Sequence, residues 1–362
     1  MNVKVMGNVT VNIYTTQPPP YQARDSEFVQ EFVPNGWPQR QRPPMGERLI
    51  DKSNGKTRPW KGKKVGTIKL SKALHALEHH KKANRVWWCG AELEFKECPE
   101  TGKKTLCRAH FCRERLCIMC SWRRSIKMFF QLSQVLDIAQ QENPDTALLF
   151  LTLTVKNCRG GELYGTLDEM FEGWRRLVNH RRVKTAIKGW FRALEVTYNR
   201  KEDTYHPHFH AVLMVDKSYF YDKKAYLQTE NWVHMWRTSC RLGYDPICDI
   251  RAVRKQSAER NRKHVAELTK YTVKESDILQ GDEETTTKVV DVLGTSLKGR
   301  RLHAYGGILK EIAKRLKIKE NPKEDDLIVL NENDTIREDV SNLIAVYKWD
   351  YGLSDYFRQG KL

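Results

Sequence analysis

Two histidines in the segment YHPHFHAVLMV, residues 205–215, have the spacing of a metal site. His208 and His210 flank one phenylalanine at the start of an apolar run, which predicts a buried strand. Because side chains alternate between the two faces of a strand, both imidazoles share one face and could hold one metal ion. The plain alternative is a polar turn that leads into a core strand.

A third metal ligand is expected from a neighbouring strand. Mg²⁺ and Mn²⁺ favour oxygen donors, so the two imidazoles need a carboxylate beside them. Glu195, in the segment ALEVT, could reach the face of the histidines across an antiparallel ladder. The alternative is an ordinary strand carboxylate.

A candidate nucleophile lies in the segment AELTKYTVKESD, residues 266–277. The surrounding pattern predicts a long polar helix over about residues 256–276. On that helix, Glu267, Tyr271 and Lys274 would share one stripe, because they follow at i, i+4 and i+7. A carboxylate, a phenol and an ammonium on one stripe suit catalysis, whereas a solvated face that carries a tyrosine is the plain alternative.

The cysteines predict a second metal site. Cys117 and Cys120 form a CxxC pair, and Cys112 lies five residues before it, a spacing that suits a small Zn²⁺ knuckle. Cys98 is our choice for the fourth ligand. The sequence alone does not decide between it and three other candidates: Cys89, Cys107 and His110.

The charge of the chain indicates a polyanionic partner, such as nucleic acid or an anionic membrane. Lys and Arg number 63 against 45 Asp and Glu, which gives a formal net charge of +18. The excess is local, because residues 51–130 hold 20 basic and 7 acidic side chains, whereas residues 320–362 hold 5 and 10.

Two short basic segments are candidates for DNA contacts. Trp122, Arg123 and Arg124 directly follow the CxxC pair and could present a stacking surface and cations to DNA. Arg300 and Arg301, in GRRLHAYGG, form the second basic element.

Regular patterns between residues 148 and 276 predict the elements that position these side chains. Strands are expected over residues 148–157, 190–198, 209–215 and 247–253, and helices over about 166–188, 223–241 and 256–276. The order β, α, β, β, α, β, α indicates an α+β fold. We expect an antiparallel sheet of ferredoxin-like or split type with helices on one face, plus a small zinc-binding segment.

Taken together, the motifs resemble those of the HUH endonucleases. YHPHFHAVLMV looks like their metal-binding motif, ELTKYTVKESD like their nucleophile motif, and FLTLTVKN (150–157) like the strand motif that precedes both. The specific match is to the one-tyrosine rolling-circle replication initiators of small plasmids of Gram-positive bacteria. The likeness covers about residues 85–315.

This resemblance implies an enzyme that nicks and joins single-stranded or hairpin origin DNA with the help of Mg²⁺ or Mn²⁺. Tyr271 would attack the scissile phosphate, form a 5′-phosphotyrosine and free a 3′-OH primer. Lys274 would neutralise phosphate charge or stabilise the phenolate. The family assigns activation of a water or a 3′-OH in the terminating step to the position of Glu267.

The sequence divides into four parts. These are a flexible N-terminal arm, a basic DNA-binding segment with the cysteine knuckle, a catalytic domain and an acidic C-terminal segment: residues 1–50, 51–130, 145–315 and 316–362. The acidic segment could pack against the main domain, or contact a second copy of the chain or a host helicase. Because no stretch reaches the roughly 18 apolar residues that span a bilayer, we expect a cytoplasmic protein without a membrane partner.

Two other functions stay open. A zinc-containing DNA-binding regulator without chemistry fits the basic charge and the cysteines. The two-histidine strand combined with the tyrosine helix favours an enzyme over that regulator. A relaxase or a transposase would share the histidine motif, but relaxases usually carry their tyrosine near the N-terminus and a third histidine in the motif.

Overall fold

The computed structural model describes residues 46–53, 55–253, 265–266, 268–269, 272–279, 281–318, 327–328 and 343–359. Contacts divide the chain into two units. One comprises residues 1–43 and 351–353, of which only the turn at 351–353 is described. The other, residues 44–350 and 354–362, contains the helices and strands given below. The predicted N-terminal arm lies outside the described residues up to residue 45.

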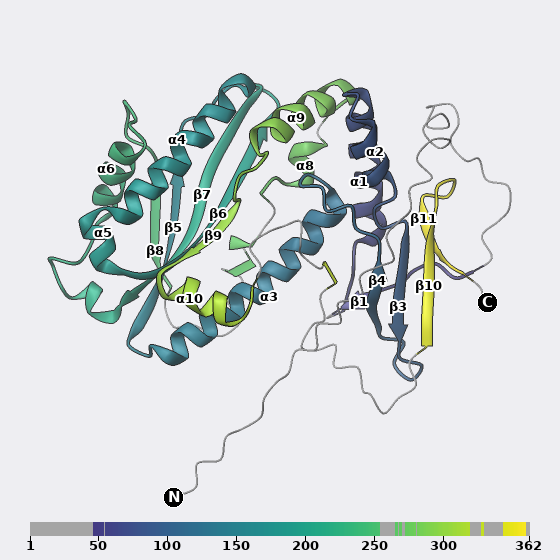
Figure 1. The fold of residues 1–362 in the computed structure, drawn as a ribbon, viewed down its shortest axis with the longest axis horizontal. Coiled ribbons are helices and arrows are strands. Elements are labelled where there is room, and N and C mark those ends of the chain that lie inside the picture. The colour runs from purple at the N-terminus through teal and green to yellow at the C-terminus, as the bar shows by residue number, and fades with distance from the viewer. Residues whose placement is uncertain are drawn as a thin grey trace, which may run out of the picture. The chain divides into compact units, whose positions relative to one another are not determined.

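A five-stranded antiparallel sheet contains the predicted strands (Figure 1). The strand order is β8-β5-β7-β6-β9, and each pair of neighbours is antiparallel. The strands are β5 Thr146–Thr154, β6 Ile187–Asn199, β7 Thr204–Asp216, β8 Cys248–Ala252 and β9 His303–Gly306. The predicted α+β class with an antiparallel sheet is therefore confirmed.

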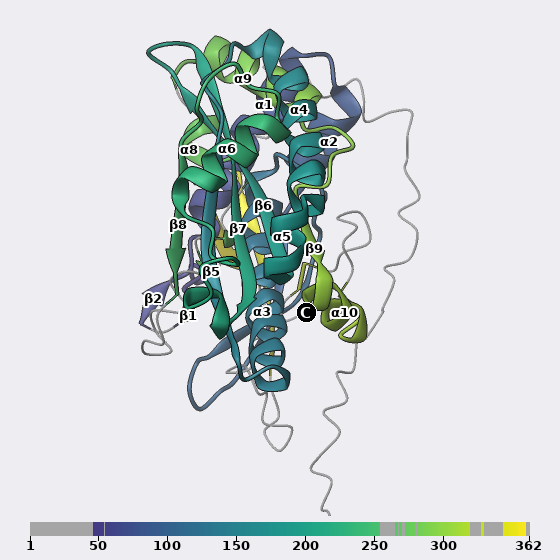
Figure 2. The same cartoon turned by 90° about the vertical axis from the view of Figure 1, so that its left-hand side faces the viewer.

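Helices cover both faces of this sheet rather than the one face that we expected. Helices α4 (Gly160–Asn179) and α6 (Thr229–Ser239) pack on Phe209, whose ring centroid lies 5.9 Å from that of Trp174 and 6.0 Å from that of Trp236. Figure 2 shows α5 (Arg181–Ala186) and α6 on the near side of the strands. Helices α3 (Ile118–Glu142) and α10 (Gly307–Arg315) pack on the opposite face. Both faces of β7 can be apolar because both are covered.

The core on the second face joins α3 (Ile118–Glu142) and α10 (Gly307–Arg315) to the sheet. Val212 and Met214 of β7 belong to this core, and so do Val265 and Leu268 from the segment of the predicted long helix. Because residues 208, 210, 212 and 214 alternate onto the same side of β7, the two histidines continue the face on which this core is built.

Two predicted helices are interrupted. The pattern over residues 166–188 forms α4 and α5 (Arg181–Ala186), because His180 between them has an extended backbone with ψ 133°. In the segment 256–276, residues 272 and 273 form a bend, and Lys274 has an extended backbone before the short helix α8 (Glu275–Ile278). Helix α9 (Glu283–Ser296) follows, with Asp282 as its N-cap.

A second sheet joins segments that are distant in the sequence. Its strand order is β11-β10-β3-β4, with β3 Glu92–Glu97, β4 Lys104–Ala109, β10 Leu343–Asp350 and β11 Asp355–Arg358. Strand β10 pairs antiparallel with β3, so the acidic C-terminal segment contributes two strands to the sheet of the cysteine segment. The remaining elements are β1 Lys52–Ser53, β2 Lys56–Thr57, α1 Trp60–Ala76, α2 His80–Trp87 and the 3₁₀ helix Lys217–Phe220. None of the described helices is long and apolar enough to cross a membrane.

Candidate metal sites and catalytic residues

Strands β6 and β7 bring three predicted metal ligands together. Glu195 pairs directly with His208, and the next pair on the same face is Ala193 with His210, so the carboxylate and both imidazoles share one face. The Oε2 atom of Glu195 lies 3.3 Å from Nε2 of His208 and 3.0 Å from Nε2 of His210. These three side chains form a group that could hold a metal ion.

The Nδ1 atoms of both imidazoles are held by neighbours, which turns the Nε2 atoms toward Glu195. Nδ1 of His208 lies 3.2 Å from the carbonyl oxygen of His206, and a carbonyl can only accept, so Nδ1 donates. Nδ1 of His210 lies 3.2 Å from Oγ1 of Thr152, which can accept in the same way. Each Nε2 then directs a lone pair at the carboxylate, an arrangement that needs a proton or a metal ion between the atoms.

Thr152 is a supporting residue that the sequence interpretation missed. The signal was present in the alternation of FLTLTVKN, which places Thr152 on the strand face opposite to its leucine neighbours. In the structure, Thr152 pairs with His210 across the β5–β7 ladder. It therefore fixes the orientation of that imidazole.

Lys274 reaches the same site. Its Nζ lies 2.9 Å from Oε1 of Glu195, and the backbone N–H of Val196 donates to the carbonyl of Thr272 at 2.7 Å, which anchors residues 272–274 to β6. Burial acts to raise the pKa of Glu195. When a proton occupies Nε2 of each imidazole, hydrogen bonds from His208 and His210, together with the one from Lys274, outweigh burial and hold that pKa well below its usual range. Glu195 is therefore a carboxylate at neutral pH.

The other two predicted catalytic residues, Glu267 and Tyr271, lie outside the described residues. The expected stripe of three residues on one helix is wrong for Lys274, which is the N-cap of α8 with φ −69° and ψ 148°. Lys274 thus reaches Glu195 from a bend rather than from the predicted helix.

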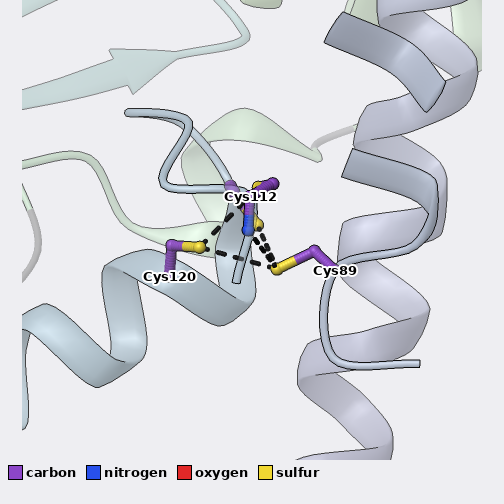
Figure 3. Close-up of side chains that lie close together, drawn as sticks. Cys89, Cys112 and Cys120 are labelled. Atoms are coloured by element: carbon purple, nitrogen blue, oxygen red, sulfur yellow. Dashed lines mark hydrogen bonds between the residues drawn. The ribbon is translucent and has the colours of Figure 1, made fainter. Parts of the chain in front are cut away.

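Four buried cysteines form the second candidate metal site, and Figure 3 shows three of their side chains directed at one another. The Sγ–Sγ distances are 3.5 Å for Cys89–Cys120, 3.7 Å for Cys112–Cys120 and 3.6 Å for Cys89–Cys117. A tetrahedral zinc site with Zn–S bonds of about 2.3 Å has sulfurs about 3.8 Å apart. The spacing fits such a site and is too long for a disulfide bond of about 2.05 Å.

The fourth sulfur of this group belongs to Cys89 rather than to Cys98. Cys89 follows α2 and is fully buried, whereas Cys98 lies in the turn between β3 and β4, where its backbone N–H donates to the carbonyl of Lys103. Backbone N–H groups also point at the sulfurs, from Cys112 to Cys89 at 3.4 Å and from Arg113 to Cys120 at 3.3 Å. Such N–H donors stabilise thiolates.

The candidate DNA contacts after the CxxC pair are largely internal. Trp122 is 7% exposed and packs edge-on against Trp60, and Arg123 is 2% exposed and donates to the carbonyl of Leu327. These two predictions are wrong, because buried side chains cannot contact DNA. Arg124 is half-buried and donates to the carbonyls of Arg113 and Glu114.

In the second basic element, one arginine is bonded within the protein and the other is exposed to solvent. Arg300 pairs with Asp168 at 2.5 Å, donates to the carbonyl of Ser296 and lies over the ring of Tyr164, so its guanidinium serves the fold. Arg301 is exposed and stays a predicted DNA contact.

Comparisons with known proteins identify relatives of this chain. The model of the replication protein family, Rep_1, matches residues 103–357. "Protein rep" of Bacillus amyloliquefaciens is 39% identical over 331 residues, which cover 85% of this chain and 96% of that protein. "Protein rep" of Streptococcus pneumoniae is 36% identical over 316 residues, with coverages of 86% and 96%. "Protein rep" of Lactiplantibacillus plantarum is 34% identical over 319 residues, with coverages of 86% and 99%. No solved structure matches.

Proposed function

Because this chain belongs to the Rep_1 replication protein family of plasmid replication initiators, we propose that it nicks and rejoins one strand of plasmid origin DNA. The observation that carries this proposal is the meeting of Glu195, His208 and His210 on one sheet face, with Lys274 beside them. A regulator that only binds DNA has no use for a carboxylate and two imidazoles aimed at one point.

The three ligands fit a divalent cation such as Mg²⁺ or Mn²⁺. In their neutral form the two imidazoles direct Nε2 lone pairs at the point where the carboxylate oxygen of Glu195 lies, so a cation would take the place of the protons between these atoms. When bound, the ion would neutralise the non-bridging oxygens of the scissile phosphate. Lys274, on the outer side of Glu195, would place a further positive charge beside the incoming DNA.

Tyr271 is the nucleophile of this proposal. It is bonded to Thr272, and the carbonyl of Thr272 accepts from Val196, the residue after Glu195. The phenol oxygen would attack phosphorus, the bond from phosphorus to the 3′ oxygen would break, and that oxygen would take up a proton as a free 3′-OH. The product, a 5′-phosphotyrosine, keeps the energy of the broken linkage, so joining needs no ATP. Glu267 is the proposed base of the terminating step.

The cysteine group is proposed to hold structural Zn²⁺. Three sulfur–sulfur distances of 3.5, 3.7 and 3.6 Å within the group suit a tetrahedral site, and four cysteine ligands would leave no position for a substrate. Burial raises the pKa of Cys89 and Cys112, so without a cation these buried groups favour the neutral thiol. Origin DNA is the proposed partner, while a host helicase and a second copy of the chain stay predictions.

The test is trapping of the covalent intermediate. The protein is incubated with Mn²⁺ and a labelled single-stranded oligonucleotide from its own plasmid origin, then denatured and separated by size. We expect a labelled adduct with the unmodified chain and none with Tyr271→Phe.

Tyr221→Phe is the matched control, because Tyr221 is 86% exposed and its change removes a surface phenol that is not part of the proposed site. An adduct that survives in Tyr271→Phe would refute the assignment of the nucleophile. No adduct with the unmodified chain would favour the DNA-binding regulator.

A further inference from the structure

Helix α2 presents a polar stripe that the proposed nicking chemistry does not use. Lys81, Asn84, Arg85 and Trp88 follow at i, i+3, i+4 and i+7, so they lie along one line of the helix and its C-cap. All four side chains are exposed, and Trp88 is 42% exposed although it is a large aromatic residue. Lys82 is also exposed and flanks the stripe.

The opposite side of α2 is fixed to the protein. Ala83 and Val86 are fully buried. From α1, the Ser71 hydroxyl donates to the carbonyl of Ala83 at 2.7 Å, and Lys64 Nζ donates to the carbonyl of Trp87 at 2.5 Å. Cys89, two residues after the helix ends, belongs to the cysteine group. The buried side of α2 and its C-terminal end are therefore both fixed, which holds the exposed stripe rigidly.

The charge around the stripe is positive. Helix α2 contains no acidic residue, and no carboxylate among the described residues pairs with Lys81 or Lys82. Arg85 pairs with Glu114. Helix α1 adds Lys69 and Lys72, which are both exposed. A polyanion would thus meet the cations of α2 on one rigid helix.

We propose that α2 docks into the major groove of double-stranded DNA. An α-helix with its side chains is about 10–12 Å in diameter, and the major groove is about 12 Å wide, so the groove admits such a helix. Lys and Arg pair with guanine edges, and Asn pairs with adenine, so the stripe holds side chains that read base edges in that groove. The exposed Lys82 is placed for a phosphate.

Duplex DNA fits this surface better than a single strand does. Platforms for single strands stack successive bases on several aromatic rings along a groove, whereas this stripe offers one tryptophan on a projecting helix. The surface is also separate from the β6–β7 site, so the proposal goes beyond the nicking reaction. One surface would hold the duplex, and the other would act on an exposed strand.

The test compares two double variants by fluorescence anisotropy. The probes are a labelled duplex of 30 base pairs with arbitrary sequence and the corresponding single strand, each titrated at several salt concentrations. For Lys81→Ala/Lys82→Ala we expect about a tenfold or greater loss of duplex affinity, because a groove contact and a phosphate contact are lost, and a salt slope that is smaller by about 1 for the phosphate contact of Lys82. Alanine favours the helix, so α2 should stay folded.

Lys223→Ala/Lys224→Ala is the matched control, because it removes two exposed lysines from a loop after β7. We expect this control to bind the duplex like the unmodified chain. Equal duplex affinity of the two double variants would overturn the proposal, and so would an equal loss for duplex and single strand in Lys81→Ala/Lys82→Ala. Adduct formation at Tyr271 is measured in a separate experiment. The comparison of duplex affinities could therefore still be interpreted if the nicking proposal failed.

Discussion

Among single residues, Cys89 and Cys98 differ most sharply in their expected roles. Cys89 contributes a buried sulfur to the four-cysteine group, whereas Cys98 lies in the β3–β4 turn. We predict that Cys89→Ser loses the bound zinc, about one equivalent in the unmodified chain, and is destabilised by several kcal/mol, because zinc binding contributes directly to folding. Cys98→Ser should keep both its zinc and its stability. Metal analysis of purified protein and thermal unfolding measure the two effects.

Residues close in sequence were easier to predict than residues joined only by the fold. The spacing of His208 and His210 fixes a common strand face, so their partnership follows from alternation alone. Cys89 is 23 residues from Cys112, and only the packing of α2 beside the start of α3 selects it over Cys98. The prediction that Arg123 contacts DNA was wrong because the sequence gives the charge of a side chain but not its solvent exposure.

Among the elements, strand β9 carries a histidine, His303, whose protonated form is disfavoured in the folded protein. His303 is half-buried, and burial together with the charges of Arg192 and Arg124 lowers its pKa to about 4 from 6.5. Between these two values the unfolded chain binds a proton that the folded chain does not. The free energy of unfolding should therefore fall as the pH drops from about 6.5 toward 4.

Between pH 7 and pH 5, we predict that the free energy of unfolding falls by about 1 to 2 kcal/mol less in His303→Gln than in the unmodified chain. Urea unfolding at the two pH values measures it. The exposed His234→Gln is the control and should leave the pH dependence as it is. An unchanged loss in His303→Gln would show that other groups cause the acid sensitivity.

Strand patterns were more reliable than helix patterns in this chain. The four strands predicted from the apolar runs all occur, because a short run between turn residues has few other ways to be buried. The long polar helix over 256–276 failed at its C-terminal end, where the hydrogen bond from Val196 to the carbonyl of Thr272 ties the backbone to β6. The helical periodicity of a sequence does not predict such a tertiary hydrogen bond.

At the scale of the whole molecule, Arg115 links the cysteine group to the segment of the second basic element. It lies between Cys112 and Cys117 in sequence, and its Nη1 donates to the carbonyls of Leu297 and Arg300 at 2.5 and 2.7 Å. The knuckle is thus bonded to the chain that leads into β9 and on to the main sheet.

We predict that Arg115→Ala destabilises the protein by about 1 to 3 kcal/mol, because two carbonyls lose a charged donor. Proteolysis near residues 297–302 should become faster, while the zinc content stays unchanged. Arg108→Ala is the control: the side chain of Arg108 is 72% exposed and pairs only at the surface with Glu94, so we expect little effect. Equal stability of the two variants would argue against the link.

Because β10 pairs with β3, the second sheet can be completed only after the ribosome has synthesised residues 343–350. While residues 343–350 are still missing, a growing chain exposes one edge of β3, and an open strand edge invites pairing with other chains. A premature stop ahead of β10 should consequently yield aggregates or degraded fragments rather than a weaker initiator.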